Sequence, residues 1–184
     1  MKSKTVGDFM LPLSDHATVS EEATLQEAAL AFEQACASND CQSGNMILVL
    51  NKAGQPIGEL SELEMLRSLE PGYKAIGDLR STSLSGLNTE FLTNMLQHSN
   101  LWQDPLGALC EKAATIRVGD VDYQPLADQS VTVLTPLTQA IHFLIVCQRE
   151  CLLVKDTRAG AYVGVLHRRA VLQEVLQRIQ ACGI

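Results

Sequence analysis

The chain has 184 residues, of which 46% are hydrophobic and 4% aromatic, and it carries a formal net charge of −7. This acidic balance argues against broad nucleic-acid binding, because neutralising phosphates requires a basic surface. No apolar run approaches the roughly 18 residues that span a bilayer, and the N-terminus lacks a signal-peptide core. We therefore expect a cytoplasmic protein without nucleic-acid or membrane partners, whose six cysteines are thiols rather than a disulfide framework.

The first third of the chain alternates helical and strand patterns. Thr24–Glu27 has the form of a capping box and predicts a helix that ends near Ala37. The apolar run Met46–Leu50 predicts a buried strand, and Pro56–Leu60 predicts a second strand joined to it by a turn. Ser61-Glu62-Leu63-Glu64 then opens another helix. The expected order is strand, helix, strand, strand, helix, with the first strand near residues 17–19.

The middle of the chain has helical patterns of its own. Asn88 is a candidate cap for a helix that carries Phe91 and Leu92, and Asp104-Pro105 is a candidate start for a further helix. Residues 70–115 are therefore expected to form a helical connector rather than a flexible linker.

The last third of the chain predicts the same order of elements as the first. Thr135 is a candidate cap with Pro136 at the first helical position. Leu152–Lys155 and Ala161–Leu166 predict a hairpin, and apolar residues at helical spacing predict a final helix. Those apolar residues are Val171, Leu172, Val175, Leu176 and Ile179.

The two ends of the chain are related as a tandem duplication. Val6-Gly7-Asp8 recurs 112 residues later as Val118-Gly119-Asp120, and further along Gly58 is matched by Gly164 at an offset of 106. The first copy therefore has six extra residues, which fit a lengthened surface loop over 35–44. Copies of this size lie near the limit for independent folding, so we expect them to pack on each other.

The ordered recurrence of these motifs resembles the cystathionine-beta-synthase (CBS) motif. In the first copy the resemblance rests on Val6–Met10, Ala17–Val19, Ile47–Leu50 and Gly58–Glu64. The whole chain resembles a stand-alone CBS-domain pair, or Bateman module, with motifs over 1–69 and 116–184 on either side of the connector. The resemblance implies an α+β fold of two β-α-β-β-α units packed about a pseudo-twofold axis with two clefts between them.

The same resemblance implies a candidate ligand site in the first copy. Gly58, Ser61 and Glu64 match the positions at which members of the family hold ribose hydroxyls, although Glu64 stands where the family has an Asp. A capping box alone would also explain Ser61 and Glu64. Thr18, Val19 and Ile57 match the pocket wall around the adenosine, and core packing would explain them equally well.

The second copy lacks this carboxylate, because His167 and Ala170 occupy the equivalent positions. His167-Arg168-Arg169 is nevertheless the most basic cluster in the chain and lies at an expected helix N-terminus, which favours anions. It could hold the phosphates of a nucleotide bound by Ser61 and Glu64. The alternative is a solvated first turn whose arginines pair with Glu174.

Two functions follow from the resemblance. The first is a regulatory module that binds AMP, ADP, ATP or S-adenosylmethionine and acts as a homodimer on an effector protein in trans. The second is a ligand-free CBS fold that serves only dimerisation or docking. No enzyme, metal site or required cofactor is expected, because the four histidines form no catalytic arrangement and no phosphate-binding glycine loop is present.

Overall fold

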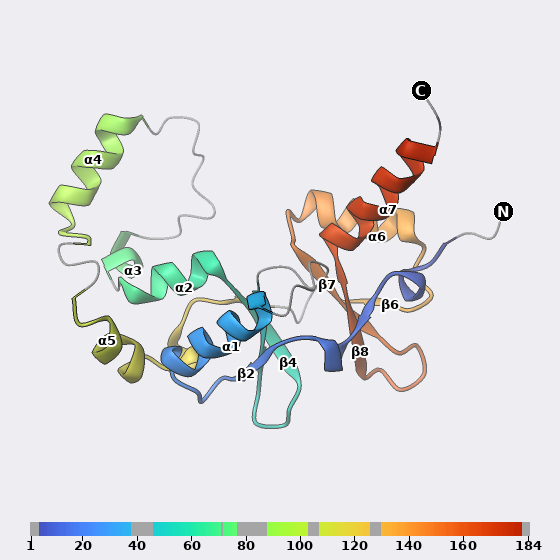
Figure 1. Ribbon diagram of the computed structural model, residues 1–184, viewed down its shortest axis with the longest axis horizontal. Coiled ribbons are helices and arrows are strands. Elements are labelled where there is room, and N and C mark those ends of the chain that lie inside the picture. Colours follow the sequence, from blue (N-terminus) through green and yellow to red (C-terminus); the bar gives the residue numbers. More distant parts are fainter. Residues whose placement is uncertain are drawn as a thin grey trace.

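The protein was analysed as a computed structural model, which describes residues 4–37, 46–70, 72–76, 88–102, 107–125 and 130–181. Two four-stranded sheets lie side by side at the centre (Figure 1). One sheet has the order β2 (Thr18–Ser20), β3 (Met46–Leu50), β4 (Pro56–Ser61), β5 (Gln124–Pro125). The other has the order β1 (Leu11–Pro12), β8 (Tyr162–His167), β7 (Cys151–Lys155), β6 (Ser130–Thr132).

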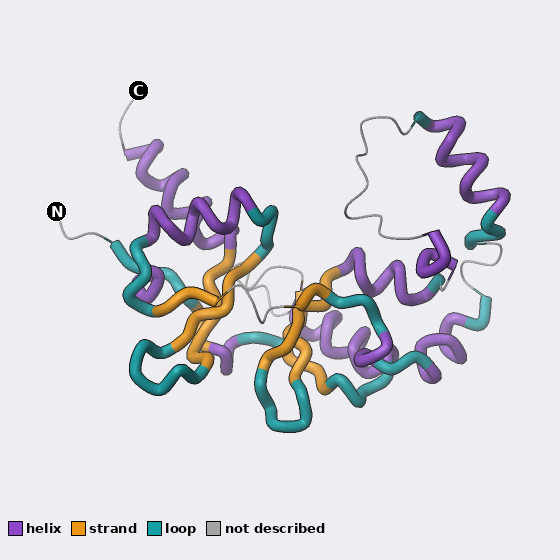
Figure 2. The backbone as a smooth tube through the Cα atoms, turned by 180° about the vertical axis from the view of Figure 1, so that it is seen from behind, coloured by secondary structure: helices purple, strands orange, loops and turns teal. Residues whose placement is uncertain are grey.

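Helices cover the outer sides of these sheets (Figure 2). The first half carries α1 (Leu25–Ala37) and α2 (Glu62–Leu69), and the second carries α6 (Leu137–Val146) and α7 (Arg168–Ala181). The connector contributes α3 (Gly72–Ile76), α4 (Thr89–His98) and α5 (Leu109–Thr115). The α+β fold class and the repeated order of strand, helix, strand, strand, helix are confirmed.

Most of the predicted helix ends are confirmed, with one correction. The Asn88 side chain caps α4 by accepting the backbone N–H of Phe91 at 2.7 Å. Pro136, however, is the N-cap of α6 rather than its first helical residue, because its ψ of 136° is not helical. The predicted helix start at Asp104-Pro105 and most of the predicted loop over 35–44 lie outside the described residues.

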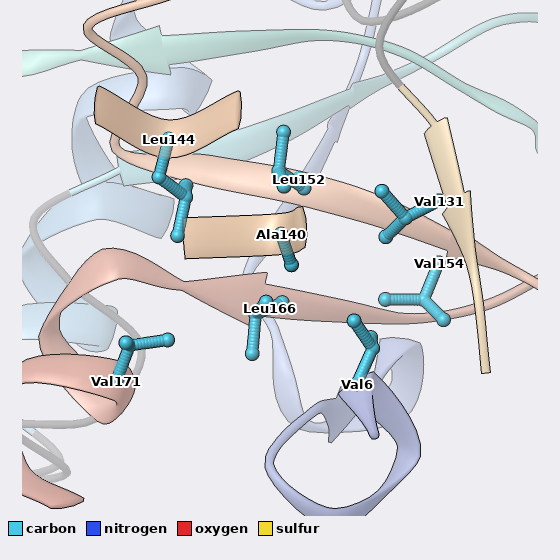
Figure 3. Close-up of a cluster of buried hydrophobic side chains, with 8 residues drawn as sticks. All are labelled: Val6, Val131, Ala140, Leu144, Leu152, Val154, Leu166 and Val171. Atoms are coloured by element: carbon cyan, nitrogen blue, oxygen red, sulfur yellow. The ribbon is translucent and has the colours of Figure 1, made fainter. Parts of the chain in front are cut away.

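The first turn of the chain packs on the second half of the molecule. The backbone N–H groups of Val6 and Gly7 donate to the carbonyls of Thr135 and Val133 at 2.9 and 3.0 Å. The short strand β1 then pairs antiparallel with β8, with Leu11 opposite Val165. The side chain of Val6 is fully buried among residues of the second half, as Figure 3 shows.

The matching segment of the second copy packs on the first half in the same way. Val118 and Gly119 donate to the carbonyls of Ala23 and Glu21 at 2.9 and 2.7 Å, and β5 pairs with β4. The fully buried side chain of Val118 belongs to the core of the first half. Each half therefore contains the Val-Gly-Asp segment of the other sequence copy. At these segments the boundary of a sequence copy differs from the boundary of a structural half.

Three apolar clusters hold the fold together. One lies between the second sheet and its helices (Figure 3), and the equivalent cluster lies in the first half. The third cluster joins the two sheets face to face through Met46, Leu48, Cys151, Leu153 and Val165. Residues that alternate with the helix-facing positions of β3, β4, β7 and β8 therefore point toward the other half, and they set the position of the site described next.

Candidate functional site

A cleft of about 850 Å³ lies between the two halves where β4 runs into α2 and β8 runs into α7. Ser61, Glu62 and Glu64 line it from the first half, and His167 and Arg169 line it from the second. The remaining lining residues are Met46, Glu59, Leu63, Gln148, Glu150, Arg168, Leu172, Gln173 and Leu176. The structure therefore brings together five of the residues singled out in the sequence: Ser61, Glu64, His167, Arg168 and Arg169.

Ser61 and Glu64 form the capping box that their spacing predicted. The Glu64 carboxylate accepts the backbone N–H of Ser61 at 3.2 Å and also its hydroxyl, and the reciprocal contact from the Ser61 side chain completes the box. Glu64 is only 2% exposed. Burial of this carboxylate is tolerated because its oxygens accept hydrogen bonds, which compensate part of its lost hydration. The local sequence thus places a buried carboxylate at the cleft without any ligand.

The three residues of the basic cluster, His167-Arg168-Arg169, have different surroundings. Arg168 pairs with Glu150 at 2.5 Å, and both residues line the cleft from the second half. The pairing of these arginines with Glu174 was predicted wrongly, because Glu174 instead contacts Lys4 and Arg178. Residues six apart on a helix point in different directions, so Arg168 is turned away from Glu174. Arg169 is exposed and lines the cleft.

His167 is buried at the cleft and contacts another buried histidine, His16. The two Nε2 atoms are 2.6 Å apart, and the ring planes are nearly parallel, at 13° to each other, with centroids 4.9 Å apart. Nδ1 of His16 lies 2.9 Å from the carbonyl oxygen of Pro12. Burial lowers the pKa of both imidazoles, that of His167 to about 3, because the charged form loses hydration. His167 is therefore neutral at physiological pH and supplies no positive charge for a phosphate.

A second buried carboxylate, Glu59, lines this cleft from β4. It accepts a hydrogen bond from the Cys151 thiol at 2.9 Å, and Arg149 lies 3.8 Å from its other oxygen. Burial raises the pKa of Glu59, while the thiol and the guanidinium oppose that shift. Burial also raises the pKa of the Cys151 thiol well above its usual value, so this sulfur is an unreactive hydrogen-bond donor.

Comparison with solved structures identifies the architecture. The CBS-pair protein CBSX2 from Arabidopsis thaliana is 20% identical and superposes with a TM-score of 0.59, covering 97% of this chain and 99% of that one. A structure of CBSX2 in complex with AMP is 22% identical, with a TM-score of 0.57 and coverage of 95% and 97%. The chain has the fold of a CBS-domain pair.

The same fold also matches part of a longer chain. The cytosolic domain of the Mg²⁺ channel MgtE in complex with ATP is 16% identical, with a TM-score of 0.54, and covers 93% of this chain and 48% of that one. No protein-family profile and no curated protein matches the sequence. The superpositions establish the CBS-pair fold. Because the sequence identities are low, the ligand of this chain has to be inferred from its own residues.

Three other residues predicted for the site lie elsewhere in the CBS pair. Val19 is buried in the core of the first half, Ile57 packs against the same core, and Thr18 is exposed on β2. Among the described residues, none of these three lines the cleft. Ala170, which matches Glu64 in the second copy, is half-buried and is not among the cleft-lining residues either. The interpretation of Val19 and Ile57 as core residues is confirmed.

Glu59 and His16 were not predicted from the sequence. The signal for Glu59 was a charged residue at an interior position of a strand, where the matching residue of the second copy is Val165. No local signal marked His16, because its partner is 151 residues away. Glu59 is a candidate because the two sheets face each other, and His16 is one because β1 crosses to the second sheet.

The described residues contain neither a cluster suited to a metal ion nor a helix suited to a membrane. No group of three or more histidine, cysteine, aspartate or glutamate side chains in those residues is arranged to hold a metal ion. Within the same residues, none of the helices combines the length and the hydropathy needed to cross a bilayer.

Proposed function

We propose that this chain is a regulatory CBS pair that binds an adenosine-containing small molecule in the cleft between its halves and acts on a partner protein. The observation that carries the proposal is the cleft itself. Two separately encoded strand-to-helix junctions, at Ser61 and His167, line one space of about 850 Å³. That size lies in the usual range of small-molecule sites, roughly 300–1,000 Å³.

The fold neighbours support the choice of ligand class. One related structure contains AMP and another contains ATP. In the sequence resemblance Glu64 matches the family's ribose-binding carboxylate, and its capping contacts fix this buried carboxylate in place before any ligand binds. A ligand held there would contact both halves and favour one arrangement of them, which is how occupancy would be transmitted.

We further propose that the chain forms a homodimer through exposed apolar helix faces. Leu63 and Leu66 on α2 are more than half exposed, and α7 presents a longer apolar stripe. That stripe comprises Leu172, Val175, Leu176 and Ile179. Apolar surface of this extent is usual at interfaces between protein chains. Light scattering at micromolar concentration tests this, and a monomeric mass contradicts it.

A second candidate function is a docking module that binds no ligand. It is favoured by the capping box, which already supplies Glu64 with hydrogen-bond donors, and by the His16–His167 contact, which fills part of the space at the second junction. In that case the exposed faces of α2 and α7 would be the docking surfaces of the pair.

Thermal unfolding with and without ligand separates the two candidates. A compound that binds only the native state at about a hundredfold over its dissociation constant adds roughly 2.7 kcal/mol, which raises the melting temperature by several degrees. Mass spectrometry of small molecules released from the purified protein would identify a bound adenosine compound. No shift with adenosine, AMP, ADP, ATP or S-adenosylmethionine at millimolar concentration would favour the docking module.

A further inference from the structure

The side chain of His167 points from the second sheet toward the first half. Leu166 belongs to the helix-covered core of the second half, whereas Val165 belongs to the cluster that joins the two sheets. Because successive side chains of a strand point to opposite faces, His167 lies on the same face as Val165. It is 2% exposed and lines the cleft. A buried polar side chain therefore forms part of the cleft at the second junction.

The hydrogen bonds of the two histidines fix where their protons lie. The carbonyl oxygen of Pro12 can only accept, so Nδ1 of His16 carries the proton of that ring. Burial lowers the pKa of His16 and so favours its neutral form, in which Nε2 is an acceptor. The contact at 2.6 Å then requires Nε2 of His167 to be the donor.

Nδ1 of His167 is left as a hydrogen-bond acceptor. Within the part of the chain that the structure describes, no partner of this nitrogen is found. A buried acceptor without a hydrogen bond is unfavourable, and a ligand that supplies a donor would satisfy it. Because this ring nitrogen carries no proton, it binds a donor and repels a second acceptor. The second junction therefore distinguishes ligand groups by whether they donate.

We infer that Nδ1 of His167 accepts a hydrogen bond from the 6-amino group of adenine, and that this contact separates adenosine compounds from those of inosine and guanosine. The inference rests on the proposed function, in which Glu64 contacts the ribose hydroxyls. Glu64 and His167 line one cleft from opposite halves, so a single ligand can contact both.

The amino group is the part of the base that suits this acceptor. The ring nitrogens of adenine that face outward accept hydrogen bonds, and the 6-amino group donates. Hypoxanthine and guanine carry an oxygen at this position, which would place two acceptors against each other. A site built around a fixed hydrogen bond rejects a compound that cannot make it, because the buried polar group of the protein is then left unpaired.

Calorimetric titration with matched nucleosides tests this selectivity. Inosine has an oxygen in place of the amino group of adenosine, and purine riboside has only a hydrogen there. We expect adenosine to bind at least about tenfold more tightly than inosine, with purine riboside between them. Inosine or purine riboside binding as tightly as adenosine overturns the inference while leaving the proposed function standing. No binding by adenosine, AMP, ATP or S-adenosylmethionine overturns both.

Two substitutions separate the nitrogens of His167. In His167→Asn the amide oxygen takes about the place of Nδ1, and in His167→Gln the amide nitrogen takes about the place of Nε2. We expect His167→Asn to restore a preference for adenosine over inosine that His167→Gln lacks. His142→Gln, at an exposed position of α6 outside the cleft lining, is the control and should bind as the wild type does. Loss of the preference in both His167 variants, or in neither, contradicts the assignment to Nδ1.

Nitrogen NMR of the histidines tests the contact in the wild-type protein. His167 should carry its proton on Nε2, and saturating adenosine should move the Nδ1 resonance in the direction of hydrogen-bond acceptance. Saturating purine riboside, which lacks the amino group, should move it much less. A His167 protonated on Nδ1, or an equal response to the two nucleosides, overturns the role assigned to this nitrogen.

Discussion

His16 Nε2 lies 2.6 Å from His167 Nε2, although the two residues are 151 positions apart in the chain. His16 follows β1, which has crossed to the second sheet, and His167 ends β8 in that sheet. The contact therefore fastens the crossing segment to the floor of the cleft. The Pro12 carbonyl accepts from Nδ1 of His16, so Nε2 of a neutral His16 accepts from Nε2 of His167. Protonation of His16 at Nε2 would place two N–H donors against each other, so His16 must stay neutral for this hydrogen bond to persist.

The first prediction is a loss of stability at mildly acidic pH. The pKa of His167 is about 3 in the folded protein against 6.5 unfolded, so the unfolded chain takes up the proton first. The stabilisation is complete above pH 6.5 and is lost as the pH falls toward 3. From the His167 shift we expect the free energy of unfolding to decrease by about 2 kcal/mol between pH 7.5 and 5.0.

Denaturant titrations at several pH values measure this slope. His167→Gln keeps an N–H donor toward His16 and removes one titrating group, so the slope should decrease by about one proton. His98→Gln at an exposed position of α4 is the control and should leave the slope unchanged. Asp15 and Arg168 lie next to the two histidines in sequence, and Glu59 and Glu64 line the same cleft as His167. A slope that persists in His167→Gln would assign the effect to such groups or to His16.

The second prediction concerns the close approach of β1 to β8. A Cβ atom on Gly164 would lie 2.5 Å from the carbonyl oxygen of Leu11, which is a backbone atom that cannot rotate away. Gly164→Ala should therefore destabilise the protein by about 3 kcal/mol through forced separation of the strands. Gly160→Ala, where no atom lies within 4 Å but φ is +65°, should cost only about 1 kcal/mol. Equal melting temperatures for the two variants would disprove this reason for the glycine.

The third prediction follows from the exchange of the two Val-Gly-Asp segments. Val6 and Val118 are both fully buried in the core of the opposite half. Truncation of either to alanine should cost about 2 kcal/mol. Each variant should still unfold in one transition, because the halves complete each other. Leu134→Ala at a side chain that is 67% exposed should change stability by less than about 0.5 kcal/mol, and two separate transitions in any variant would show independent halves.

The fourth prediction concerns Glu64 and the number of ligands bound. Glu64→Ala removes half of the capping box and should cost about 1 kcal/mol with or without ligand, and it should abolish binding of the adenosine compound. Calorimetry should give about one ligand per chain, because Ala170 offers no second carboxylate. Two ligands per wild-type chain, or full binding by Glu64→Ala, would show that this carboxylate is not the ribose contact.

The fifth prediction separates the thiols by reactivity. Cys110 and Cys147 are exposed and should react with a thiol reagent within minutes, whereas Cys151 is buried, has a raised pKa and donates to Glu59. Mass spectrometry after alkylation should find Cys151 modified only once the protein is unfolded. Rapid labelling of Cys151 in the native protein would contradict its burial between the sheets.

Local sequence determined the elements of this protein and the residues at their ends. Capping boxes at Thr24 and Ser61 and the cap at Asn88 depend on neighbours within three residues, so their patterns could be recognised directly. The repeat of Val-Gly-Asp and of the two hairpins was equally visible, and it carried the resemblance to a CBS pair. The residues of one junction, Ser61 and Glu64, could be predicted on the same basis.

Tertiary structure alone decided which residues face each other across the cleft. The crossing of β1 to β8 and of β5 to β4 depends on how two similar surfaces match, and no residue within a strand encodes that choice. The crossing brings His16 to His167, and the facing of the sheets brings Glu59 to Arg149 and Cys151. Because burial shifts the pKa of His16, His167, Glu59 and Cys151, the protonation of these groups follows from the packing of the halves rather than from either repeat.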